Sequence, residues 1–136
     1  HEQPALVEGR GELSTPVDFN LDELFILVHY PNIHVSTKDA YSGLTFGSSK
    51  GAFDVPPWSS SSIFAEPVSN WSGIVQNDFE KTIFEKHPNI AKAKTKMLEQ
   101  GALYAAMSGS GSAVFGLFNS RPSADGWQGK NWIGKF

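Results

Sequence analysis

The sequence predicts an α+β fold, a two-layer sandwich with a mostly antiparallel sheet and helices on one face. Apolar runs typical of strands alternate with segments of helical periodicity. The last two predicted strands, 102–107 and 113–118, are separated by only five residues, a link too short for a crossover and typical of a hairpin. An interleaved order that ends in such a hairpin favours helices packed on one face of an antiparallel sheet.

Composition sets the broad class of the protein. A chain of 136 residues and 14.8 kDa suits one compact domain. The formal net charge of −3 argues against a nucleic-acid binder, which is normally basic. The absence of Cys excludes disulfides and cysteine metal sites. The sequence contains no run of 18 apolar residues, so no membrane span is predicted. It also shows no basic segment followed by an apolar one at its start, the pattern of an export signal.

The first predicted strands lie in the N-terminal third of the chain. Residues 5–8 form a short strand candidate that ends at a Gly-Arg-Gly turn. Residues 24–30 are an almost unbroken apolar run, which predicts a buried strand, and Pro31 stops it.

A short helix and a long loop follow. Ser36 and Asp39 fit a capping box, with Ser36 as the N-cap of a helix from Thr37 to about Leu44. Residues 42–62 are rich in Ser and Gly and are expected to form a long loop.

The middle of the chain predicts two or three helices. Pro67 suits a first helical position, and one apolar stripe follows it at Val68, Trp71 and Val75. Asn77 and Glu80 repeat the capping signature, so the acid at Glu80 is interpreted as a first-turn residue that favours the helix dipole.

Pro88 begins the last predicted helix. Gly101 is a natural stop for it, and residues 119–131 beyond the hairpin are rich in turn formers. The apolar side of the helix is expected to hold Ile90, Ala93, Met97 and Leu98.

The sharpest local feature is the segment Ser108-Gly109-Ser110-Gly111-Ser112 between the hairpin strands. Alternating glycines let backbone N–H groups converge on an anion, and the serines add hydroxyl donors. A dinucleotide or P-loop motif would need a helix after the loop, whereas a strand is predicted here. The local pattern leaves two interpretations open, a plain hairpin turn and a phosphate-contacting loop.

A second candidate segment joins the strand at 24–30 to the short helix. The free N–H groups around Ser36 and Thr37 at the start of the helix favour anions. Tyr41, one turn further on, offers a ring for stacking. The alternative is an ordinary cap at Ser36 and a Tyr41 ring that packs on the core.

Three further side chains are candidates for a site. Lys94 projects into the apolar side of its helix, where it can extend to the edge of the core or reach back toward the Ser-Gly segment. His29 and His34 have no partner at metal-ligand spacing, so no metal site is predicted.

Three stretches together resemble the GHMP kinase superfamily, and within it the kinases of a cytidine-diphosphate-linked methylerythritol. Their order and spacing match the family across nearly the whole chain. The stretches are ALVEGRGE at 5–12, VSTKDAY at 35–41, and NDFE at 77–80 leading to MSGSGSAVF at 107–115.

The resemblance implies a GHMP-kinase C-terminal-domain-like, ferredoxin-like sandwich over residues 17–136, preceded by a remnant of the N-terminal kinase domain at 1–16. It implies a cytoplasmic enzyme that uses ATP and Mg²⁺ to phosphorylate the 2-hydroxyl of 4-diphosphocytidyl-2-C-methyl-D-erythritol. The implied substrate-binding residues are Ser36, Thr37 and Tyr41, with Tyr41 stacked on the cytosine. The implied ATP phosphate loop is Ser108, Gly109, Ser110, Gly111 and Ser112.

The same resemblance implies that the catalytic residues lie in a missing N-terminal half, because no stretch here matches the principal ATP loop of the family. The chain alone is therefore expected to fold without kinase activity and to be prone to form a homodimer. The expected partner is a small-molecule substrate, with no nucleic acid and no membrane. The alternatives are another GHMP kinase of homoserine or mevalonate type, and a non-catalytic ferredoxin-like ligand-binding module.

Overall fold

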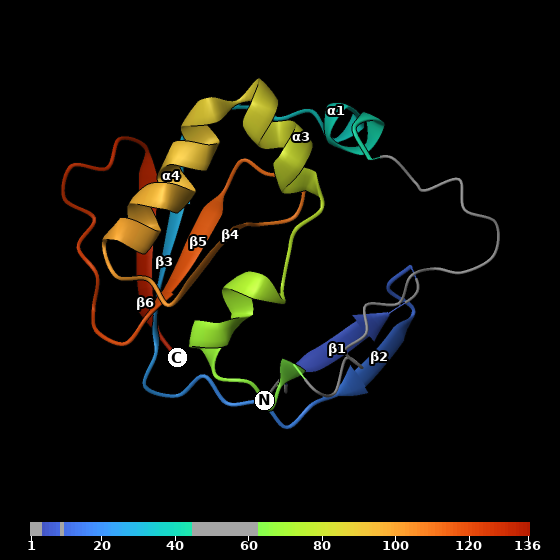
Figure 1. Cartoon of the computed structure of the whole chain (residues 1–136), viewed down its shortest axis with the longest axis vertical. Helices are drawn as coiled ribbons and strands as arrows, with labels where there is room; N and C mark the ends of the chain where they lie inside the picture. The colour runs from blue at the N-terminus through green and yellow to red at the C-terminus, as the bar shows by residue number, and fades with distance from the viewer. Residues whose placement is uncertain (1–3, 9, 45–62) are drawn as a thin grey trace.

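The computed structural model describes residues 4–8, 10–44 and 63–136, so most of the predicted 42–62 loop lies outside the described residues. Its elements confirm the predicted α+β class (Figure 1). In chain order they are β1 (Ala5–Glu8), β2 (Leu13–Pro16), β3 (Phe25–Tyr30), α1 (Thr37–Ser42), the 3₁₀ helix η1 (Val68–Gly73), α3 (Phe79–Lys86), α4 (Pro88–Glu99), β4 (Tyr104–Met107), β5 (Val114–Phe118) and β6 (Lys130–Lys135).

The main sheet has four strands in the order β4-β5-β3-β6, and every neighbouring pair is antiparallel. By position in the chain this order is second, third, first, fourth, as in a ferredoxin-like fold. The last link, residues 119–129, is irregular where that fold has its second helix. The predicted hairpin is present, with Met107 opposite Val114 in the β4–β5 ladder.

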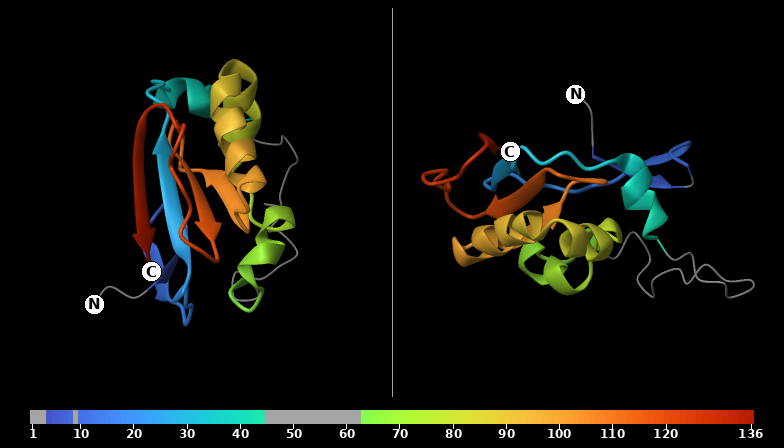
Figure 2. Two further views of the ribbon diagram at one scale, coloured as in Figure 1. Left: turned by 90° about the vertical axis from the view of Figure 1, so that its left-hand side faces the viewer. Right: turned by 90° about the horizontal axis from the view of Figure 1, so that it is seen from above.

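Helices α3 and α4 cover one face of this sheet, and α1 lies beside α3 at one end of the layer (Figures 1 and 2). The main core forms between the two layers. Its fully buried side chains include Leu27 of β3, Ile83 of α3 and Met97 of α4. The predicted apolar side of α4 is confirmed except for Leu98, which is 40% exposed because it lies on the solvent side of the last turn.

The side chains of β4 alternate between two clusters. Ala105 and Met107 belong to the main core, whereas Tyr104 and Ala106 join a second cluster with η1. Its members from the η1 region, Val68, Trp71 and Val75, are the predicted apolar stripe.

The backbone at the stripe is a 3₁₀ helix and not the expected α-helix. Ser69, Asn70, Ser72 and Gly73 are all weaker helix formers than Ala or Leu, and six residues are too few to outweigh them.

Two strands were missed by the sequence analysis. Strand β6 lies partly within the segment expected to be turns, and its sequence Lys-Asn-Trp-Ile-Gly-Lys carries little β signal beyond its alternation. It exists because it pairs with β3 along six residues. Strand β2, which ends in Pro16, pairs with β1 in a separate two-stranded sheet that lies apart from α3 and α4 (Figure 1).

Within the described ranges, no helix has the length and apolar character that a membrane crossing requires.

Candidate functional site

The two segments singled out from the sequence lie against each other. The segment after β3 packs on the bend between β4 and β5, because β3 and β5 are neighbours in the sheet. The Ser112 hydroxyl donates a hydrogen bond to the carbonyl of Ile33. Val35 is buried in the same core cluster as Met107 and Val114, which flank the bend. The structure therefore brings the predicted phosphate and substrate segments to one end of the sheet.

Ser36 is the N-cap of α1, as predicted, but the capping box does not form. No side-chain hydrogen bond caps the helix. The Asp39 carboxylate that should reach back to Ser36 is exposed, and only the Ser36 carbonyl takes part, accepting from the Ala40 amide at 3.0 Å. The Ser36 hydroxyl thus has no role in holding α1, and Thr37 is exposed beside it.

Tyr41 does not pack into the core. Its side chain is 55% exposed, and its ring meets the Phe79 ring in a T-shaped contact, with centroids 5.0 Å apart and planes at 73°. Phe79, the first residue of α3, therefore orients the Tyr41 ring without covering it. An aromatic ring held in this way has a surface available for stacking.

The bend at 108–112 is tightly closed. The Gly111 amide donates to the Ser108 carbonyl at 3.0 Å, and the Ser108 amide donates to the Ala113 carbonyl at 2.8 Å. Gly109 has a φ of 54° and Gly111 a φ of 90°, conformations that favour glycine. Among the described residues, nothing accepts a hydrogen bond from the amides of Gly109 and Ser110.

The five residues of the bend do not all face outward. Ser108 and Gly109 are exposed and Ser110 is half-buried. Ser112 is only 3% exposed, and its hydroxyl is taken up by Ile33. Ser112 therefore fixes the bend. The Gly109 and Ser110 amides and the Ser108 hydroxyl are the donors of the bend with no acceptor among the described residues.

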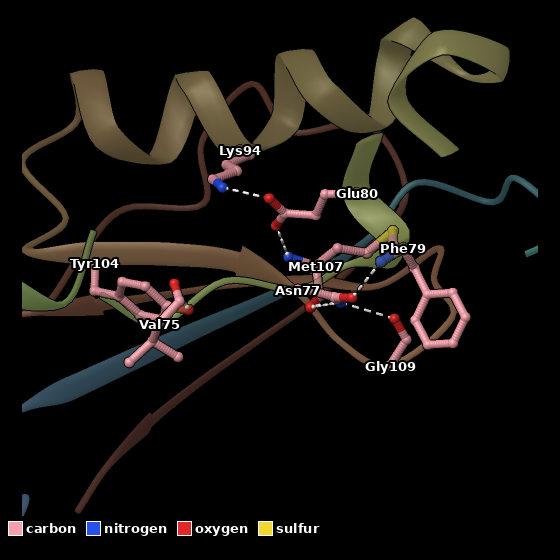
Figure 3. A network of polar contacts seen from close by, with 8 residues as sticks. All are labelled: Val75, Asn77, Phe79, Glu80, Lys94, Tyr104, Met107 and Gly109. Carbon is pink, nitrogen blue, oxygen red and sulfur yellow. Dashed lines mark hydrogen bonds and ion pairs between the residues drawn. The ribbon is translucent and has the colours of Figure 1, made fainter. Parts of the chain in front are cut away.

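Asn77 holds the bend by hydrogen bonds from the segment that precedes α3 (Figure 3). Its amide nitrogen donates to the carbonyl of Met107 at 2.7 Å and to that of Gly109 at 2.8 Å. Its amide oxygen accepts from the Phe79 amide at 3.0 Å. One side chain thus begins α3 and holds two carbonyls of the bend.

Glu80 joins α4 to the same region. One carboxylate oxygen pairs with Lys94 Nζ at 2.6 Å, and the other accepts from the Met107 amide at 2.8 Å (Figure 3). The interpretation of Glu80 as a residue serving only the helix dipole is therefore wrong. Lys94 reaches toward the bend, as one of the two alternatives held, but its partner is Glu80 and not the bend itself.

Tyr104 lies beside this ion pair in β4. Its hydroxyl donates to the Val75 carbonyl at 3.2 Å. Burial raises the pKa of Tyr104 to about 12, and the negative charge of Glu80 adds to the effect. The phenol therefore stays protonated and keeps its hydrogen bond at neutral pH.

A groove of about 680 Å³ opens on the far side of the network. Asn77, Glu80, Lys94 and Tyr104 contribute to its lining, but no residue of 36–41 or 108–112 does. The segment from Asn77 to Glu80 therefore separates this groove from the candidate site.

Sequence analysis missed the roles of two residues: it assigned Asn77 only to a helix start, and it took Phe79 as part of an apolar helix face. The available signal for Asn77 was the choice of Asn at the predicted cap position, which the structure gives to the next residue, Asp78. A Ser or Asp there could also accept from the helix amide, but only Asn adds an NH₂ group that donates twice.

Comparison with known proteins shows what this chain resembles. Residues 64–127 match the family described as GHMP kinases C terminal. A curated relative from Porphyromonas gingivalis, named 4-diphosphocytidyl-2-C-methyl-D-erythritol kinase, is 42% identical over 90% of this chain and 43% of its own length. A relative of the same name from Cytophaga hutchinsonii is 43% identical over 86% of this chain and 41% of its own.

A solved structure agrees with these relatives. The crystal structure of 4-(cytidine 5'-diphospho)-2C-methyl-D-erythritol kinase matches 96% of this chain and 48% of its own, with a TM-score of 0.64 and 25% identity. This chain spans about two fifths of the length of the curated relatives described above.

Proposed function

We propose that this chain, in which residues 64–127 match the C-terminal family of the GHMP kinases, forms one wall of the binding cleft of a 4-diphosphocytidyl-2-C-methyl-D-erythritol kinase. The complete protein would transfer the γ-phosphoryl group of ATP to the 2-hydroxyl of that substrate. The relatives with this name support the substrate, and they match nearly the whole chain. In this proposal residues 1–16 belong to the preceding kinase domain and 17–136 to the substrate-side domain.

One observation carries the proposal. A bend with two amides that have no acceptor among the described residues lies against the segment that leads to an exposed tyrosine ring. The acceptor substrate has a flat base and a diphosphate, and the other substrate is a triphosphate. Amide donors suit phosphate oxygens, and an exposed ring suits a base. Ser36, Thr37 and Tyr41 would contact the acceptor, while residues 108–112 would contact the ATP phosphates.

ATP and Mg²⁺ are the cofactors in this proposal. In the described part of the chain, no three His, Cys, Asp or Glu side chains gather to hold a metal ion. The Mg²⁺ that accompanies ATP would therefore be held by phosphate oxygens and by residues outside this chain. Lys94 would act only at a distance, through Glu80.

The proposal also assigns different roles to this chain and to the rest of the protein. Phosphoryl transfer needs the metal, cationic side chains and a positioned nucleophile together. This chain offers outward amides and a ring, so we expect it to bind without catalysing when tested alone. We place the complete enzyme in the cytoplasm, with no nucleic-acid or membrane partner, and the isolated chain as a homodimer.

The experiment that tests the proposal measures ADP release by the complete protein with three acceptors: the cytidylyl substrate, homoserine and mevalonate. Turnover with the cytidylyl substrate is expected. Tyr41→Leu should raise its KM about 5- to 150-fold, which corresponds to the roughly 1–3 kcal/mol of a lost base stack. Tyr41→Phe keeps the ring and is the matched control. Turnover with homoserine or mevalonate alone would contradict the proposed substrate.

A further inference from the structure

Asn77 uses both of its donor N–H groups on the bend and its amide oxygen on the start of α3. Both donor bonds reach carbonyls of the bend, Met107 and Gly109, some thirty residues away in sequence, and the acceptor bond holds α3 at Phe79. Asn77 itself is half-buried and lies outside both segments that the proposed function assigns to ligands.

The orientation of one peptide group follows from these bonds. The peptide joining Gly109 to Ser110 is trans. In a trans peptide the C=O and N–H bonds point in opposite directions. Because the Gly109 carbonyl is directed at Asn77, the Ser110 amide is directed away from it, out of the bend.

Without the hydrogen bond from Asn77, little else would fix the orientation of the Gly109–Ser110 peptide. It follows a glycine at a positive φ, where the backbone has the widest choice of conformations. The neighbouring turn bond, from the Gly111 amide to the Ser108 carbonyl, leaves both the Gly109 carbonyl and the Ser110 amide unused. A rotation of this peptide would turn the amide inward and the carbonyl outward, where it would repel an anion.

We propose that Asn77 is a positioning residue, whose amide group holds the Gly109 carbonyl inward so that the Ser110 amide faces the phosphates of the bound nucleotide. This inference rests on the proposed function of the bend. Asn77 acts through the peptide and does not touch the nucleotide.

Asn77→Asp is the sharpest variant, because it is isosteric. The remaining oxygen can still accept from the Phe79 amide, so α3 keeps its start. The second oxygen replaces the donor and faces two carbonyls, which it repels. Asn77→Ser is a second variant that keeps an acceptor for Phe79 and is too short to reach the bend, for use if the aspartate form does not fold.

Two control variants separate positioning from simple destabilisation. Tyr104→Phe removes a hydrogen bond to Val75 in the same network without touching the bend. Phe79→Leu removes the ring that orients Tyr41 and keeps the backbone amide that donates to Asn77. Tyr104→Phe should leave ATP binding and the KM of both substrates unchanged. Phe79→Leu should raise the KM of the cytidylyl acceptor alone.

The test measures ATP binding by calorimetry and the KM of each substrate in the complete protein. Asn77→Asp should weaken ATP binding at least tenfold, the loss expected when one hydrogen bond to a charged oxygen is withdrawn. The KM of the acceptor should stay within about twofold.

An unchanged ATP affinity in Asn77→Asp would overturn the inference. So would a parallel loss for both substrates that follows the melting temperature, since that is the signature of a structural role. A wild-type protein that binds ATP but does not use the cytidylyl acceptor would overturn the proposed substrate and leave this inference standing.

Discussion

Removal of the Glu80 carboxylate should destabilise the protein more than any other single change in the polar network. Glu80→Ala withdraws two interactions at once, the acceptor for the Met107 amide and the partner of Lys94. Met107 is 2% exposed, so its amide would be left buried without an acceptor. Leaving such a group unsatisfied costs about 1–3 kcal/mol.

The ion pair adds a smaller amount. The Lys94 and Glu80 side chains are 27% and 14% exposed, so the pair is partly solvated. A fully buried pair would cost about 3–5 kcal/mol to break, and an exposed pair about 0–1 kcal/mol. We take about 1 kcal/mol, because the freed lysine can extend into water. Together the two losses give about 3 kcal/mol.

Thermal and urea denaturation followed by circular dichroism measure this loss. For a chain of this length about 3 kcal/mol corresponds to a fall in Tm of roughly 10 °C. Glu80→Gln is the matched variant, since its amide oxygen can still accept from Met107 while the charge is gone. It should lose only about 1 kcal/mol, as should Lys94→Met. If Glu80→Gln is as unstable as Glu80→Ala, the Met107 bond contributes nothing and the reasoning fails.

Three further predictions concern the core, the bend and pH. Leu27→Ala, at a side chain with 0% exposure, should cost about 2–5 kcal/mol in urea denaturation, whereas Val7→Ala, at 58% exposure, should cost little. Gly111→Ala should cost about 1–3 kcal/mol of stability, because φ is +90° and the added Cβ would lie 2.8 Å from Met107 Sδ. Gly73→Ala, with open space around it, is the control. Equal melting temperatures of the two variants would contradict this account. Because the pKa of Tyr104 is raised to about 12 in the folded state, the unfolded chain loses its phenol proton first, so the contribution of this group to stability is complete below about pH 10 and is lost as the pH rises toward 12. Urea denaturation across this range should show the decline in the wild type, and Tyr104→Phe should lack this component; identical pH profiles would argue against it.

Patterns that are local in sequence predicted the elements that depend on local causes. The apolar run of β3 and the Pro88 start and Gly101 stop of α4 were all found within about one residue. The Gly101 stop is visible in its φ of +93° and in the bond from the Ala102 amide to the Met97 carbonyl at 3.0 Å. Each of these signals is carried by residues within one turn or one strand of the feature.

Features fixed by distant partners were not predictable in the same way. Strand β6 depends on β3, about one hundred residues earlier, and its own sequence includes Asn131 and Gly134, which disfavour strands. The exposure of Leu98 depends on how α4 turns toward the sheet. Glu80 could be placed in a first turn, but its bond to Met107 depends on a strand that follows 24 residues later in the chain.

The candidate site combines both kinds of cause. Alternation of Ser and Gly made the 108–112 bend conspicuous, because glycine is what a tight, donor-rich turn requires. The same freedom means that the motif does not determine which peptide groups face outward. Here that choice depends on Asn77, which lies 32 residues before Gly109. A Ser-Gly bend of the same sequence without such a partner would keep its composition and lose its defined donor geometry, so the contacts of the 77–80 segment are as much part of the site as the bend itself.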